Sequence, residues 1–60
     1  MNHEAIEKAY RRTAELLIDN VQHHRIPKEH IEIFRKELQE CLGATIRAEC
    51  YRELMELTEL

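Results

Sequence analysis

The sequence has few of the residues that turn a chain or break a helix. Among 60 residues it contains one glycine, one proline and no tryptophan. It is also 43% hydrophobic and 35% charged, which is too apolar for a disordered tail and too poor in turn residues for a sheet protein. The composition is typical of a protein made of long helices, and we predict an all-α fold.

Long hydrophobic runs are also missing. The longest unbroken apolar stretch is three residues, at Leu16, Leu17 and Ile18. A transmembrane helix needs about 20 apolar residues and a signal peptide needs an apolar core of about 7 to 15, so neither is expected. We therefore predict a cytoplasmic protein, and two cysteines without an evident partner agree with a reducing compartment.

The chain lacks the usual means of stabilising a small domain. Sixty residues form one domain at most, and a chain of this size buries only about 60% of the surface that its unfolded form exposes. Cys41 and Cys50 cannot form a disulfide within one helix, because nine residues apart they point about 180° away from each other. We expect the missing burial to come from a second copy of the chain or from another protein.

The first half of the chain predicts one amphipathic helix, from about residue 2 to about residue 24. Its apolar residues recur at spacings of three or four, or their sum. These residues are Ile6, Tyr10, Leu17 and Val21. Pairs at i and i+4, such as Glu7 with Arg11, are expected on its solvent face.

Pro27 predicts the end of this helix and the start of the next. Proline disfavours the helical conformation of the residue before it and suits the first position of a new helix. The turn is therefore placed at about residues 25–27. A connection this short makes the two helices antiparallel neighbours, so the prediction is a helical hairpin.

The rest of the chain, from about residue 28 to about residue 59, carries one continuous helical stripe. The stripe repeats about every 3.7 residues and crosses Gly43. It consists of Ile31, Phe34, Leu38, Leu42, Ile46, Cys50, Leu54 and Leu57. One long helix is the simpler interpretation; a break near Gly43, giving three helices in all, is the alternative.

The difference in length between the two predicted helices suggests an interface. At about 1.5 Å per residue, the first helix falls roughly 13 Å short of the second and leaves its end uncovered. Uncovered apolar patches usually mark interfaces, and we place the dimer or partner contact here, with Tyr51, Leu54 and Met55 as anchors. The full predicted set is Leu42, Ile46, Cys50, Tyr51, Leu54, Met55 and Leu57.

Charge is unevenly distributed along the chain. Residues 27–60 hold eight acids and five bases, and Glu53, Glu56 and Glu59 place negative charge where the dipole of a helix disfavours it. We predict that these three glutamates steer the protein towards a basic partner surface. Basic residues gather around the turn instead, and give an alternative nucleic-acid contact through Arg25, Lys28, Arg35 and Lys36.

Catalytic and metal-binding motifs are not evident. His23, His24 and His30 lie near the turn, but their spacing matches no known ligand pattern, so we predict no metal and no cofactor. Two helices also provide no pocket for acid or base catalysis, and we predict that the chain is not an enzyme.

The functional prediction is a small helical regulator that forms homodimers and occupies the surface of another protein. Inhibitors, antirepressors and adaptors encoded by phages, plasmids and bacteria are of this kind. The alternative is a dimeric helical RNA- or DNA-binding regulator that uses the basic turn.

Overall fold

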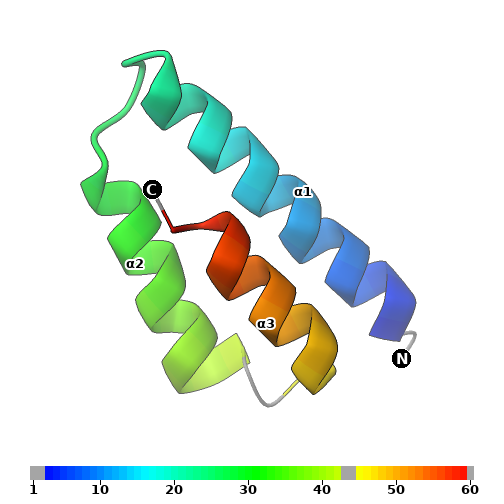
Figure 1. Ribbon diagram of the computed structural model, residues 1–60. Coiled ribbons are helices and arrows are strands. Elements are labelled where there is room, and N and C mark those ends of the chain that lie inside the picture. The colour runs from blue at the N-terminus through cyan, green and yellow to red at the C-terminus, as the bar shows by residue number, and fades with distance from the viewer. Residues whose placement is uncertain (1–2, 43–44, 60) are drawn as a thin grey trace.

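The computed structural model describes residues 3–42 and 45–59, and this part of the chain is all-helical, as predicted. Helix α1 spans His3–Gln22, α2 spans Glu29–Glu37 and continues into a π-helical turn, η1, at Leu38–Leu42, and α3 spans Ala48–Leu57. Figure 1 shows that the chain reverses direction after α1 and again before α3, and that α3 lies between the other two helices.

The unbroken helix expected over residues 28–59 is wrong, and the alternative of three helices is observed. The second helical segment ends at Leu42 and α3 begins at Ala48. Gly43 itself lies outside the described residues. The sequence around the break accounts for it, because glycine and the β-branched Thr45 and Ile46 are all poor helix formers.

Helix α1 ends two residues earlier than expected, in a hydrogen-bonded reversal. The backbone N–H of Arg25 donates to the carbonyl of Asn20 at 2.8 Å, and that of His24 donates to Val21 at 3.0 Å. This pair of bonds is the Schellman motif, which requires a left-handed residue after the helix. His24 fills that position with φ of 58°, a conformation in which histidine is enriched among non-glycine residues.

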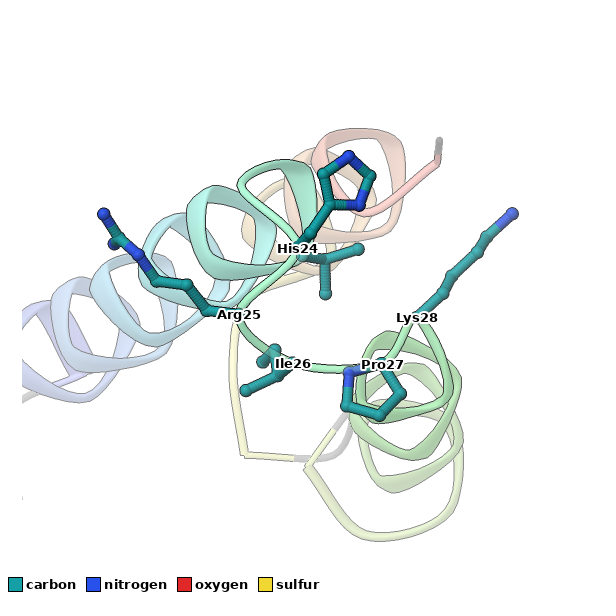
Figure 2. Close-up of a pocket in the computed structure, with 6 residues that line it drawn as sticks. His24, Arg25, Ile26, Pro27 and Lys28 are labelled. Atoms are coloured by element: carbon teal, nitrogen blue, oxygen red, sulfur yellow. The ribbon is translucent and has the colours of Figure 1, made fainter.

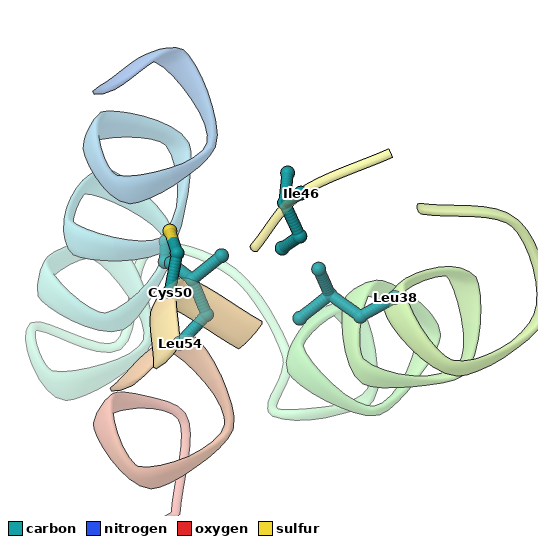
Figure 3. Close-up of a cluster of buried hydrophobic side chains, with 5 residues drawn as sticks. Leu38, Ile46, Cys50 and Leu54 are labelled. Carbon is teal, nitrogen blue, oxygen red and sulfur yellow. The ribbon is translucent and has the colours of Figure 1, made fainter. Parts of the chain in front are cut away.

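One hydrophobic core is shared by all three helices. Figure 3 shows the side chain of Leu38 directed from the α2 segment towards Ile46 and Leu54. Tyr10 and Phe34 are half-buried and pack against the edge of this core. The buried hydrophobic residues are Ala14, Ile18, Ile31, Leu38, Ile46, Cys50 and Leu54.

Contacts between α1 and α3 show that the two helices run in the same direction. Glu7 of α1 contacts Arg47 just before α3, and Arg11, one turn later in α1, contacts Glu53 within α3. At 1.5 Å per residue, α1 is about 30 Å long and α3 about 15 Å. The difference in length is therefore the reverse of the predicted one, because the break leaves α3 as a short helix alongside a longer α1.

None of the described helices is both long enough and apolar enough to cross a membrane.

Two leucines of α3 allow the core to be tested. Leu54 is 0% exposed and Leu57 is 40% exposed. We expect Leu54→Ala to reduce the free energy of unfolding by about 2 to 5 kcal/mol, enough to unfold much of so small a domain. Leu57→Ala should cost less than about 1 kcal/mol. Urea denaturation followed by circular dichroism measures both, and equal losses would contradict this packing.

Candidate protein interface

Three residues predicted to contact a partner lie in the core of their own chain. Ile46, Cys50 and Leu54 are 7%, 3% and 0% exposed, packed among residues of the other helices. Within the folded chain these three side chains are covered by their own helices and are not part of its surface. The physical reason is the break after Leu42, which lets α3 fold back so that its apolar stripe is covered from within.

The other predicted contacts lie nearer the surface. Tyr51 and Met55 are half-buried and pack against the core, and Leu57 is exposed. Leu42 belongs to η1, but its side chain lies outside the described part of the structure. Tyr51, Met55 and Leu57 therefore remain available in part for contact with another molecule.

The outer side of α3 is predominantly acidic, with one exposed base, Arg52, among its glutamates. These glutamates are Glu49, Glu53, Glu56 and Glu59, and all four are exposed. We call this set the acidic face. Glu53 pairs with Arg11 of α1, whereas the other three side chains form no ion pair within the described residues. The last turn of α3 contains no basic residue to balance them.

An ion pair between a buried glutamate of α1 and an exposed arginine fixes the start of α3 on α1. Glu7 is 6% exposed, and its carboxylate accepts hydrogen bonds from Nε and Nη2 of Arg47 at 2.8 and 2.7 Å. It also accepts the backbone N–H of Arg47, the N-cap residue of α3, at 3.1 Å. Three side-chain bonds, one of them a second bond from Nε at 3.1 Å, and one backbone bond orient the guanidinium and the first turn of α3 together.

Sequence patterns gave the wrong partner for Glu7. The expected pair with Arg11 on the solvent face does not form, because Glu7 lies in phase with the buried Ala14 and Ile18. The helical spacing of Glu7 from Ala14 and Ile18 places it on the buried side of α1, and this spacing could have been read from the sequence.

The electrostatics of this pair follow from the hydrogen bonds. Donation by the Arg47 side chain holds the pKa of Glu7 below its ordinary value of 4.5, and this effect outweighs the opposing effect of burial. The carboxylate in turn raises the pKa of Arg47. Both groups are therefore charged at neutral pH, and the pair stabilises the fold there.

The basic residues proposed for nucleic-acid contact do not form one patch. Arg35 faces inward, and its Nη1 donates to the carbonyl of Met55 at 2.8 Å and to Oγ1 of Thr58 at 2.9 Å, at the end of α3. Arg25 lies 3.7 Å from the carboxylate of Asp19. Lys28 and Lys36 are exposed but stand eight residues apart along α2, so the patch is divided.

A shallow hollow lies at the α1–α2 turn. Val21, Ile26 and Pro27 give it an apolar floor, and Figure 2 shows the side chains of Arg25 and Lys28 extending away from it in different directions. His24 also borders it. Because the side chains of Arg25 and Lys28 do not point towards one place, the hollow is not arranged to bind an anion.

The histidines and the described cysteine, Cys50, are not part of a metal or nucleophilic site. In the described part of the chain, no three His, Cys, Asp or Glu residues are arranged to hold a metal ion. His23 and His24 are exposed at the end of α1, and His30 is exposed on α2. Burial raises the pKa of the Cys50 thiol, which makes it a poor nucleophile.

Comparison with known proteins gives no relative: no family model, no curated protein and no solved structure matches the chain.

The Glu7–Arg47 pair predicts a specific dependence of stability on pH. A carboxylate whose pKa is lowered by folding stabilises the native state above its unfolded pKa, and this contribution is lost as the pH falls through the lower, folded value. We expect Glu7→Gln to be less stable than the wild type at pH 7, and the difference to shrink steadily below about pH 4.5.

Urea denaturation at a series of pH values measures this difference. Glu32→Gln, which changes an exposed carboxylate of α2, serves as the control and should lie close to the wild type throughout. A Glu7→Gln deficit that stays constant down to about pH 2 would contradict the role assigned to the ion pair.

Proposed function

We propose that this chain is a small regulator that binds another protein through the acidic face of α3. The observation that carries the proposal is that Glu49, Glu56 and Glu59 are exposed without an ion pair in the described structure. No ion pair within the described structure gives these three side chains a role in stabilising the fold. Negative charge near the C-terminus of a helix even opposes the helix dipole.

The chemistry of the partner follows from this face. Three adjacent carboxylates favour a surface rich in lysine or arginine, and charge of this kind mainly speeds encounter and selects the partner. Exposed Leu57, with half-buried Met55 and Tyr51, supplies apolar contact beside the glutamates. The partner is thus a basic protein surface with an apolar element.

The mode of action is occupation of that surface. The hollows on the described surface are lined by charged side chains but by no cysteine, and no three metal-binding side chains converge among the described residues, so the proposal includes no catalytic step. An inhibitor, an antirepressor or an adaptor in the cytoplasm matches a chain of this size and charge. Formation of a homodimer is part of the same proposal.

Nucleic-acid binding receives less support from the structure. Arg35 is held by the end of α3 and Arg25 lies beside Asp19, which leaves only Lys28 and Lys36 of the four predicted contacts. The acidic face would also repel phosphates.

Capture from extracts of the source cell tests this proposal. The wild type and Glu49→Lys/Glu56→Lys serve as baits, beside Glu32→Lys/Glu37→Lys, which makes the same charge change on exposed positions of α2. We expect a basic protein to be retained by the wild type and by the α2 control. Its retention should fall about tenfold or more with the α3 variant, and added salt should weaken it.

Equal losses with the two double variants would show that net charge alone is responsible, and would contradict the proposal. Capture of nucleic acid with no basic protein would contradict it as well. Circular dichroism of each bait confirms that the variants are folded.

A further inference from the structure

A basic cluster lies in the middle of α1 next to the acidic face. It consists of Lys8, Arg11 and Arg12, all exposed. Arg11 pairs with Glu53, whereas Lys8 and Arg12 form no ion pair with any described residue. Two open hollows of about 270 and 420 Å³ adjoin the cluster, and both are lined by Lys8 and Arg11.

The basic cluster of α1 and the acidic face of α3 lie at the same level along the common direction of the two helices. Because α1 and α3 are parallel and Arg11 meets Glu53, Lys8 and Arg12 fall within the stretch of α3 between Glu49 and Glu56. Glu49 and Glu56 lie four residues before and three after Glu53, so the three share one side of α3.

Of the acidic residues of α1 near α3, Glu7 is paired with Arg47, and the exposed Glu4 and Glu15 lie at the edges of this arrangement. Glu4 precedes the level at which α3 begins, and Glu15 falls near the level of the exposed Leu57. The positive charge of α1 is therefore concentrated opposite the negative charge of α3, and not spread along the helix.

Such a face is complementary to a second copy of itself. A two-fold axis parallel to α1 and α3, in front of the charged face and midway between the two helices, places α1 of one protomer over α3 of the other without changing the height of either. Interfaces of this kind are isologous, so each contact occurs twice.

We propose that in the free protein a second copy of this chain covers the acidic face. Lys8, Arg11 and Arg12 of each protomer pack against Glu49, Glu53 and Glu56 of its partner. The inference rests on the proposed function in taking the acidic face as the docking surface, but it names what occupies that face when no basic protein is present.

An exposed apolar side chain adjoins the acidic face. Leu57, four residues after Glu53, adds an apolar contact on the same side of α3. Exposed ion pairs each add little and are screened by salt, so the dimer is weak and sensitive to salt.

A regulatory consequence follows from the shared surface. The basic cluster of the second copy and the basic partner protein contact the same glutamates, so dimer formation and partner binding exclude each other. The free dimer masks the acidic face until a more basic surface displaces the second copy.

Exchange of charges between the two surfaces tests the dimer. Sedimentation equilibrium at low salt, up to about 1 mM protein, measures the mass of the wild type, Lys8→Glu/Arg12→Glu and Glu49→Lys/Glu56→Lys. We expect the wild type to rise above 7.2 kDa with concentration, and each variant alone to associate at least tenfold more weakly. An equimolar mixture of the two variants should form a heterodimer tighter than the wild-type dimer.

The matched control separates this geometry from general attraction. Glu32→Lys/Glu37→Lys carries the same net charge as the α3 variant but places it on α2. Mixed with Lys8→Glu/Arg12→Glu, it should form no tight heterodimer.

Two results would overturn the inference: a wild type that remains at 7.2 kDa at every concentration, or equal association with the α3 variant and the α2 control. Failure here removes the homodimer from the proposed function, and leaves the binding of a basic protein standing if the acidic face still captures one. If the dimer forms but no basic protein is captured, the binding of a partner protein is contradicted and the dimer stands.

Discussion

The contact between the buried carboxylate of Glu7 and Arg47 determines how α3 lies in the molecule. It joins the first third of α1 to the residue that begins α3, through both the side chain and the backbone N–H of Arg47. With that point fixed and the two helices parallel, Cys50 and Leu54 turn into the core. A buried charge left without its partner is costly, so this pair also selects the arrangement against alternatives in which it is broken.

The surface follows from the same register. The rotation of α3 that buries Leu54 turns Glu49, Glu53 and Glu56 outward, beside the basic cluster of α1. The fold uses Glu53 in one exposed pair and leaves the others to solvent. Residues that the core and the ion pairs do not require are the ones that the proposed function employs, and the acidic face is therefore a property of how α3 packs as well as of its composition.

Composition predicted the helical class, hydrophobic periodicity predicted the helix that became α1, and Pro27 predicted that this helix ends before it, because all three depend on local preference. Hydrophobic periodicity also selected residues that are buried, such as Ile46 and Leu54. Periodicity does not specify which molecule buries them, and an unbroken helix assigned them to a partner. Glu7 and Arg35 were assigned to solvent because of their charge, although their contacts depend on α3, which is distant in sequence.

The most direct test of this account is whether α3 packs on α1 within one chain. A nuclear Overhauser effect between the methyl groups of Ala14 and Leu54, recorded on labelled chains diluted with unlabelled ones, reports that contact inside the protomer. The account predicts a strong intrachain signal, since both side chains are 0% exposed in the shared core. Its absence, together with helical amide contacts running without interruption from residue 38 to residue 57, would show a single long helix and contradict the account.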